Sequence, residues 1–268
     1  MSSLDRARIA KLSRAAHGGI LSVDDAARAL EVSAHAAAIT LAGLARRGWL
    51  TRARRGLYLV RPLEAEPTQA AAPEDPWILA REAFAPCYVG GWSAAEHWGL
   101  TSQLFRSTLV VTAASGRSRD VTILGQRFRL FRVPRPRIEG RGIVAVRRGA
   151  ERVPVSTPER TLVDGLRRPE LCGGIRNVAD LLREYSLHDA HVEALLAEAA
   201  AAGSGAAWKR LGYLAERVWP NAAVADAAAR HATAGNVALD PAVRRRGTLL
   251  CRWRLWVNVP IEAGPSGG

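Results

Sequence analysis

Residues 33–60 read SAHAAAITLAGLARRGWLTRARRGLYLV, and the first half of this stretch predicts a helix. Ser33 is a residue type that caps a helix N-terminus, because its hydroxyl can accept a hydrogen bond from a free backbone N–H. Ala37, Leu41 and Leu44 then repeat at the spacing of one helical face. We therefore expect a helix that Ser33 caps and that buries this apolar stripe.

The second half of the stretch predicts a two-stranded hairpin. The helix is expected to run to Arg47, because Gly48 readily adopts the left-handed conformation that ends a helix. Trp49-Leu50-Thr51 and Leu57-Tyr58-Leu59-Val60 have the composition of strands, and Arg54-Arg55-Gly56 lies between them as a turn.

Two further helices are expected before this stretch. The first covers Leu4 to Ala16, and the second follows Ser22, with Asp25 at the capping-box position. Three helices followed by a hairpin are the element order of a winged helix-turn-helix. The sequence therefore predicts that residues 1–62 form a DNA-binding domain of this type.

The helix after Ser33 is the one that would enter the major groove, since the second helix of such a pair reads base edges. Its outward face is expected to hold His35, Ala38, Ile39 and Ala42, with Arg46 at its end. His35 can donate a hydrogen bond to a base or a phosphate, and Ile39 can contact a thymine methyl group. This face has no Arg, Asn or Gln placed for bidentate base recognition, so sequence specificity would depend on Ile39, DNA shape or contacts from elsewhere.

Arginines cluster at the end of this helix and along the hairpin. The arginine side chain suits phosphate because its planar guanidinium donates two parallel hydrogen bonds and keeps its charge. Such contacts position a protein on DNA without reading the sequence. The candidate DNA-binding residues are Ser33, His35, Ile39, Arg46, Arg47, Arg52, Arg54 and Arg55.

The net charge of the chain agrees with a nucleic-acid partner. The formal net charge is +13 and the isoelectric point is about 11.0. Residues 1–62 carry a net charge of +7, so the N-terminal quarter is the most basic part of the chain. An excess of positive charge favours a polyanionic partner, which is usually nucleic acid.

The remainder of the chain predicts a linker and a larger domain. Residues 63–76 are rich in Pro, Ala and Glu without apolar periodicity, as in a linker. Residues 77–268 show helical patterns, then strand-like runs, then helices, which predicts an α+β domain. Arg127 and Arg129 alternate with apolar residues and are expected on one solvent-facing side of a strand; we favour a solvated face there over a second nucleic-acid surface.

The sequence of this larger domain leads to three further expectations. Ser156-Thr157-Pro158-Glu159 predicts a capping box in which Glu159 acts as a helix cap. Alternation over Leu250–Val259 predicts one closing strand. Tryptophans in this domain are expected in the core rather than as platforms for base stacking, namely Trp92, Trp98, Trp208, Trp253 and Trp256.

Several stretches of the chain resemble one family. RGLY at 55–58, with Pro62, resembles the wing of the AbiEi-family antitoxins. The stretches that resemble the family's C-terminal domain are YVGGWSAAEHWGL at 88–100, VSTPERTLVD at 155–164, KRLGYL at 209–214 and RWRLWVNVP at 252–260.

This resemblance implies a function. By it, the first domain binds operator DNA and represses its own operon. The second domain counteracts a paired nucleotidyltransferase toxin, directly or indirectly, in a type IV toxin–antitoxin or abortive-infection system that defends against phage. Neither catalysis nor a cofactor is expected.

The alternative is a winged helix joined to a Vsr-like endonuclease domain. Such a nuclease needs clustered carboxylates that hold Mg²⁺ at the scissile phosphate. The acidic residues after Leu166 fall on helix-patterned stretches, and no strand carries a carboxylate set. Glu96-His97 and the pair Glu159 and Asp164 could suggest an enzyme, but Glu159 is better explained as a helix cap, and Asp164 lies five residues further on rather than one helical turn. We therefore expect a protein that is not an enzyme.

Cysteine content and hydropathy add an expectation about compartment. Cys87, Cys172 and Cys251 are far apart and show no metal-ligand spacing, so ordinary reduced thiols and no metal site are expected. No apolar stretch approaches the roughly 20 residues that span a bilayer, and the N-terminus lacks a signal peptide's apolar segment. These features predict a cytoplasmic protein without a membrane partner.

Overall fold

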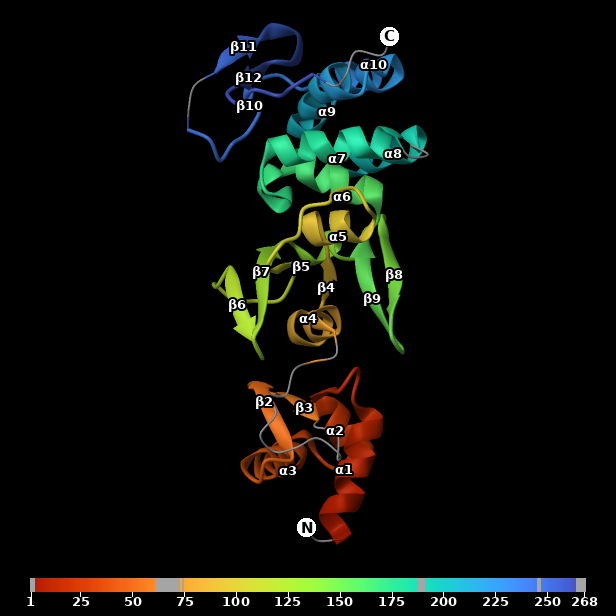
Figure 1. Cartoon of the computed structure of the whole chain (residues 1–268), viewed down its shortest axis with the longest axis vertical. Helices are drawn as coiled ribbons and strands as arrows, with labels where there is room; N and C mark the ends of the chain where they lie inside the picture. The colour runs from red at the N-terminus through yellow and green to blue at the C-terminus, as the bar shows by residue number, and fades with distance from the viewer. Residues whose placement is uncertain (1–2, 61–72, 74, 188–190, 245–246, 264–268) are drawn as a thin grey trace. The chain divides into compact units, whose positions relative to one another are not determined.

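The computed structural model describes residues 3–60, 73, 75–187, 191–244 and 247–263 (Figure 1). Helices and strands are mixed throughout, which confirms the α+β class. Contacts between residues divide the chain into two compact units. Unit one comprises Met1–Tyr88, Val110–Ile138 and Ala145–Pro154, and unit two comprises Val89–Leu109, Glu139–Val144 and Val155–Gly268.

Unit one begins with the predicted winged helix-turn-helix (Figure 1). Its strands form an antiparallel sheet in the order β1-β3-β2. The strand β1 was not expected, because three residues are too few to show a period-two pattern. The elements are α1 (Ser3–Ala15), β1 (Ile20–Ser22), α2 (Val23–Leu30), α3 (Ala34–Arg46), β2 (Leu50–Arg54) and β3 (Leu57–Val60).

A compact core explains why these elements pack as they do. The predicted stripe of α3, Ala37, Leu41 and Leu44, is fully buried. It packs in one cluster with Ile9 and Leu12 of α1 and with apolar side chains of the sheet. Burial of this face of α3 leaves the opposite face exposed, which is the arrangement that a DNA-reading helix requires.

The rest of unit one is built around a larger sheet. Its six strands lie in the order β6-β7-β5-β4-β9-β8, with β4 and β9 parallel and β6 and β7 antiparallel. Strands of this sheet continue into residues of unit two. The elements are α4 (Pro76–Phe84), β4 (Cys87–Val89), β5 (Thr108–Thr112), β6 (Asp120–Ile123), β7 (Gln126–Arg132), η1 (Arg135–Arg137), β8 (Ile143–Arg148) and β9 (Glu151–Ser156).

One strand of this sheet shows the predicted alternation. Arg127 and Arg129 of β7 are exposed, while Phe128 and Leu130 are buried. Arg129 pairs with Asp120 of β6, with 2.7 Å between Nε and Oδ1. The two arginines therefore share a solvent-facing side of the strand.

The winged helix shares a hydrophobic cluster with the rest of unit one. Ile20, Leu57 and Leu59 pack in the same cluster as Phe84 of α4 and Phe128 of β7. One face of β3 therefore packs in the helical core and the other packs in this second cluster, which explains why all four residues of β3 are buried.

Most of the expected linker lies outside the described residues. In the part that the structure describes, Asp75 caps α4 and Pro76 is the first residue of that helix.

Unit two is mainly helical and ends in a small sheet in the order β10-β12-β11 (Figure 1). Helix α6 contacts α5, α7, α8 and α9, so it is the central helix of the unit. The elements are α5 (Gly91–His97), α6 (Pro158–Arg167), η2 (Pro169–Cys172), α7 (Ile175–Leu187), α8 (Val192–Ala202), α9 (Gly205–Val218), α10 (Ala222–His231), β10 (Val237–Ala238), β11 (Thr248–Leu250), η3 (Cys251–Trp253) and β12 (Leu255–Val257).

A buried ionic cluster holds the central helices together. Arg160 of α6 donates to Asp164 Oδ2 over 2.9 Å and to Glu198 Oε1 of α8 over 3.0 Å. Desolvation raises the pKa of Glu198, and the positive charge of Arg160 opposes that rise. The cluster satisfies charges that would otherwise be costly to bury.

Three expectations for this part of the chain are wrong. Thr157, not Ser156, caps α6, because Pro158 occupies the first helical position and the Thr157 hydroxyl accepts from Arg160 N. The N-cap is therefore shifted by one residue, and no capping box forms, because Arg160 at the third helical position has no side-chain acceptor. Glu159 does not cap the helix; its carboxylate instead accepts a hydrogen bond from Tyr185.

The expected closing strand is also interrupted. Between β11 and β12 the chain forms η3, and Arg254 adopts a left-handed φ of 50° that reverses its direction. Burial still alternates through this turn, which is why the pattern resembled one strand.

The third wrong expectation is the burial of Trp256, which is 39% exposed, whereas Trp253 is fully buried as expected.

Candidate nucleic-acid interface

Capping residues set the geometry of the helix-turn-helix. Ser22 caps α2 by accepting from Asp25 N over 3.1 Å, and Asp25 Oδ2 accepts from Ser22 N over 3.3 Å, as the predicted capping box requires. Glu31 ends α2 with a left-handed φ of 57°. Ser33 then caps α3 by accepting from Ala36 N over 3.2 Å. The turn between the two helices is therefore fixed by local hydrogen bonds.

The outward face of α3 matches its predicted residues. His35, Ala42 and Arg46 are exposed, and Ile39 is 59% exposed, while Ala38 is half-buried. Positions 35, 39, 42 and 46 follow the helical repeat, so they lie along one side of α3. An isoleucine this exposed contributes nothing to the core and is free to contact a ligand.

The arginines of the predicted cluster have different environments. Arg46, Arg52 and Arg55 are exposed and have no partner in the part of the chain that the structure describes. Arg47 Nη2 lies 3.3 Å from Oδ1 of Asp5 on α1. Three of the five guanidinium groups are therefore available for phosphate as they stand.

Arg54 is restrained by an aromatic ring. Its guanidinium carbon lies 5.5 Å from the centre of the Phe84 ring of α4, within the range of a cation–π contact. Partial burial lowers the pKa of Arg54, but an arginine keeps its charge at neutral pH. The contact orders this side chain beside the hairpin turn of the wing.

The wing itself is short and irregular. Leu50 pairs with Val60 and Arg52 pairs with Tyr58, but the register shifts between Arg52 and Arg54. Gly56 closes the turn with a φ of 79°, in the left-handed region that favours glycine. A bulge next to a glycine turn strengthens the local twist and directs the exposed arginines away from the core.

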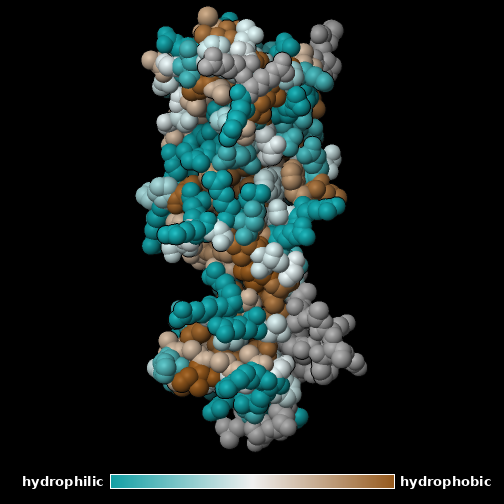
Figure 2. Space-filling model, turned by 90° about the vertical axis from the view of Figure 1, so that its left-hand side faces the viewer, coloured by the Kyte–Doolittle hydropathy of each residue, from teal (hydrophilic) through white to brown (hydrophobic). Residues whose placement is uncertain are grey.

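Polarity alone does not single out this surface. The face of the molecule in Figure 2 carries hydrophilic residues in patches along the chain, including the winged helix. What distinguishes α3 and the wing is the combination of an exposed helix face with three arginines, Arg46, Arg52 and Arg55, that have no carboxylate partner among the described residues.

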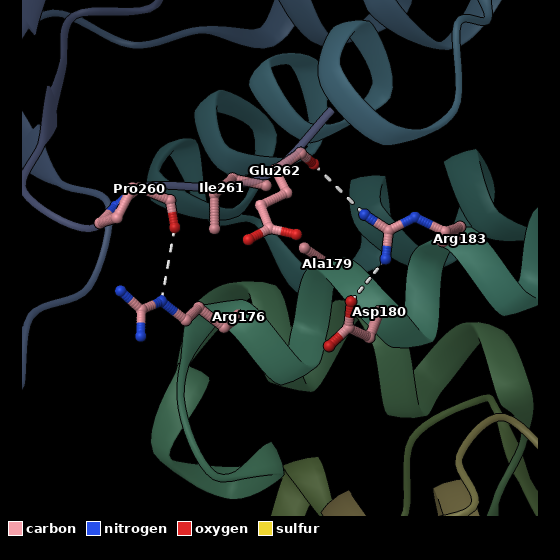
Figure 3. Close-up of a pocket in the computed structure, with 7 residues that line it drawn as sticks. All are labelled: Arg176, Ala179, Asp180, Arg183, Pro260, Ile261 and Glu262. Carbon is pink, nitrogen blue, oxygen red and sulfur yellow. Dashed lines mark hydrogen bonds and ion pairs between the residues drawn. The ribbon is translucent and has the colours of Figure 1, made fainter. Parts of the chain in front are cut away.

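A cleft in unit two has a different character (Figure 3). It encloses about 370 Å³ between α7 and residues 260–262. Arg176 Nε donates to the carbonyl of Pro260 over 3.4 Å, and Arg183 donates to the carbonyl of Glu262 over 3.3 Å. Arg183 also contacts Asp180, so the two arginines and two carboxylates of the cleft balance in charge. The two arginines hold residues 260–262 against α7, and the cleft has no excess charge for an anion.

Of the residues considered for catalysis, two have structural roles and two are exposed on the surface. Asp164 is held by Arg160, and Glu159 accepts from Tyr185. Glu96 and His97 are exposed at the end of α5. No group of three or more potential metal ligands occurs among the described residues.

Two family profiles match the chain. Residues 8–61 match a profile described as transcriptional regulator, AbiEi antitoxin, and residues 87–217 match the AbiEi antitoxin C-terminal domain. Together they span more than half of the chain. The chain belongs to the AbiEi antitoxin family. It is therefore a DNA-binding antitoxin of a toxin–antitoxin system, in a family of regulators. The segment that the alternative assigned to a Vsr-like nuclease matches the antitoxin domain instead.

The fold has a counterpart among solved structures. The crystal structure of the RV2827C protein from Mycobacterium tuberculosis is similar, with a TM-score of 0.62 and 20% sequence identity. The match covers 95% of this chain and 91% of that one. At this identity the likeness shows the fold alone. No curated protein sequence matches the chain significantly.

Within the described residues, every helix is too short or too polar to cross a bilayer.

Two residues of the interface were missed by sequence reasoning. Asp5 and Phe84 each lie about 30 residues or more from the arginine that they contact, so no local pattern connects them. The only sequence signal for Asp5 is that it is an acidic residue in the first turn of an otherwise basic helix.

Proposed function

We propose that this antitoxin represses its own operon by binding operator DNA through α3 and the β2–β3 wing. The observation that carries the proposal is the outward face of α3, where His35 and Ile39 face solvent opposite the fully buried Ala37 and Leu41. A helix with one face locked into a core and the other bare is suited to the major groove.

Base recognition in this proposal depends on few side chains. Ile39 contacts a thymine methyl group, and His35 donates to a base edge or a phosphate. Replacing Ile39 with Ala should therefore weaken binding to the operator more than binding to an unrelated duplex. Equal losses on both duplexes would exclude Ile39 from sequence recognition.

Phosphate contacts come from the N-terminus of α3, where Ser33 lies, and from the arginines of the cluster. Arg46, Arg52 and Arg55 need no rearrangement, because no carboxylate engages them in the described structure. Arg47 must first exchange Asp5 for phosphate, and Arg54 contributes from its position against Phe84.

The test is a mobility-shift titration on a duplex that spans the chain's own promoter, at several salt concentrations. Changing Arg52 and Arg55 together to Ala should weaken binding to all duplexes alike. The slope of log affinity against log salt should fall by about two, since each phosphate contact contributes about 0.9. Arg230→Ala, an exposed arginine of α10 in unit two, is the control and should leave the slope unchanged. An unchanged slope for the double variant would remove the wing from the interface.

We further propose that the antitoxin counteracts a paired nucleotidyltransferase toxin through residues 77–268, without catalysis of its own and in the cytoplasm, where operator DNA lies. The support is that the C-terminal profile covers residues 87–217, outside the winged helix. The full-length wing variant should therefore still rescue growth of cells that express the toxin from a separate promoter. Loss of rescue, at equal protein levels, would show that neutralisation requires DNA binding.

The domain limits belong to the same proposal: residues 1–62 bind DNA, 63–76 link, and 77–268 neutralise. Limited proteolysis should cut within 63–72. Because Ile20, Leu57 and Leu59 share a cluster with Phe84 and Phe128, the two pieces should still comigrate on gel filtration. Resistance of the whole chain to cleavage would count against a linker at this place.

A further inference from the structure

The small sheet at the end of unit two exposes an aromatic side chain. In β12, Trp256 lies between Ala238 of β10 and Leu249 of β11 in the paired register. Side chains at paired positions lie on the same side of a sheet, so the three form a row across it. Trp256 is 39% exposed at the centre of this row, with Ala238 and Leu249 half-buried beside it.

The sheet does not need Trp256 for its own attachment. Trp253 makes that contact, because it is fully buried against Gly212 of α9 and its indole N–H donates to Glu216 over 2.7 Å. Burial alternates from Trp253 to Trp256, so Arg254 and Trp256 are both exposed while Leu255 is buried. A large aromatic side chain is therefore presented to solvent by a rigidly anchored strand.

The surroundings of this tryptophan are positive. Arg254 lies two residues before Trp256, and Arg244 follows Val243, whose carbonyl accepts from Asn258 Nδ2 over 2.9 Å. Both arginines are exposed, and neither side chain has a carboxylate partner in the described part of the chain. Asp240 is the only acidic residue in residues 232–260, and it is buried and accepts from Ile175 N and Ala242 N.

A buried lysine adds to this positive charge. Lys209 of α9 donates from Nζ to the carbonyl of Gly235, two residues before β10. Desolvation lowers the pKa of Lys209, and the nearby charge of Arg254 lowers it further. Lys209 is itself almost fully buried, so the charge that this surface presents to solvent comes from Arg254.

We propose that this surface, defined by Ala238, Leu249, Arg254 and Trp256 and called here the Trp256 face, binds single-stranded nucleic acid. An unpaired base stacks on the Trp256 indole, and the exposed arginines contact the adjoining phosphates. A duplex fits poorly, since its base faces are covered by their neighbours. A second copy of the chain would oppose like charges. The face lies outside both matched family segments and shares no residue with the proposed operator-binding surface.

The test uses the full chain and a fluorescently labelled oligouridylate, which has exposed bases and little structure. Trp256→Leu keeps an apolar side chain but removes the stacking surface, and should weaken binding about tenfold. Trp256→Phe keeps a ring and should bind within about twofold of the unchanged chain. Trp219→Leu, at a half-buried tryptophan at the end of α9, is the matched control and should have no effect.

A second variant tests the same face without touching the tryptophan. Arg244→Ala with Arg254→Asn removes two charges, and asparagine tolerates the left-handed backbone at 254. The salt slope for oligouridylate should fall by about 1.4, since single strands contribute about 0.7 per contact. Binding to the promoter duplex should not change for any of these variants. Changing Arg52 and Arg55 together to Ala should instead weaken binding to the promoter duplex and leave binding to oligouridylate unchanged.

Three results would overturn the proposal. The first is that Trp256→Leu and the arginine variant both bind oligouridylate like the unchanged chain. The second is that Trp256→Phe loses as much affinity as Trp256→Leu at equal thermal stability, since the ring would then not act by stacking. The third is that the variants keep oligouridylate binding but lose a purified protein partner, which would make the face a protein interface.

Discussion

At the residue scale, the partner of each arginine decides how readily its guanidinium can contact phosphate. Arg46 and Arg47 are adjacent in sequence, yet within the described residues only Arg47 faces a carboxylate, that of Asp5. Exposed ion pairs of this kind contribute about 0–1 kcal/mol to stability. The pair is therefore cheap to break, and Asp5 competes with phosphate for Arg47.

Replacing Asp5 with Asn should release this competition. Affinity for the promoter duplex should rise about twofold to fivefold, within the energy of one exposed ion pair. If Arg47 then contacts phosphate, the salt slope should steepen by about 0.9. Asp5→Asn combined with Arg47→Ala should lose both gains. A gain that persists in this double variant would assign the effect to the general charge of α1 instead.

The cysteines also differ by environment. Burial raises the pKa of the Cys87 and Cys172 thiols to about 12, whereas Cys251 is exposed. Only a thiolate reacts quickly with a disulfide reagent. The native protein at pH 8 should therefore titrate one thiol quickly with such a reagent, and all three after denaturation. Cys251→Ser should abolish the fast reaction. Fast reaction of a second thiol would show that β4 or η2 opens readily.

At the element scale, the family-like stretches at 209–214 and 252–260 act together. Gly212 leaves room on α9 for Trp253, and a Cβ at 212 would lie 2.2 Å from the Trp253 ring. Arg210 donates to the carbonyls of Leu166, Ala238 and Leu239, so it joins α6 to the strand β10. These stretches attach the small sheet to the helices.

Gly212→Ala should therefore destabilise the chain. The overlap forces Trp253 or α9 to move, which typically costs about 1–3 kcal/mol of unfolding free energy. Gly43→Ala in α3 is the matched control: its Cβ would meet only Arg47 Nη1 at 3.8 Å, so it should stabilise by about 0.5–1 kcal/mol. Urea denaturation of both variants measures the difference. A neutral Gly212→Ala would show that the sheet is loosely attached.

At the scale of the whole molecule, unit one is assembled from parts far apart in sequence. Glu151 of β9 accepts from His17, just before β1, over 3.0 Å, and from Arg81 of α4 over 2.9 Å. Desolvation acts to raise the pKa of Glu151, but the hydrogen bonds and charges of Arg81 and His17 outweigh it and lower the pKa below 4.5. A single carboxylate thus joins the winged helix, α4 and the large sheet.

The sign of this shift gives a pH dependence. A carboxyl group whose pKa is lower in the folded state binds fewer protons there than in the unfolded chain. Its contribution to stability is therefore fully present above pH 4.5 and is lost as the pH falls below that value. Glu151→Gln should lower the melting temperature at pH 6 and reduce the difference between pH 6 and pH 3.5. A difference of unchanged size would mean that other carboxylates carry the acid sensitivity.

Much of the winged helix could be predicted, because its signals are local. The cap at Ser33, the stripe Ala37–Leu41–Leu44 and the stop at Gly48 each concern residues within a few positions of one another. The exposed candidates His35 and Ile39 followed from the same periodicity, since burial of one helical face leaves the other to solvent. The family could be recognised from short stretches for the same reason.

Other features depend on contacts between distant residues. The pairing of Arg47 with Asp5, the shared cluster of Leu59 with Phe128, and the different burial of Trp253 and Trp256 have no local pattern. The shift of the N-cap to Thr157 and the chain reversal at Arg254 were likewise not predicted from the neighbouring residues. Helical periodicity and capping arise from interactions between residues a few positions apart, so the sequence pattern predicts them. Which apolar side chain fills the space at Gly212, and which stays in solvent, depends on how the chain returns to α9 about 40 residues later.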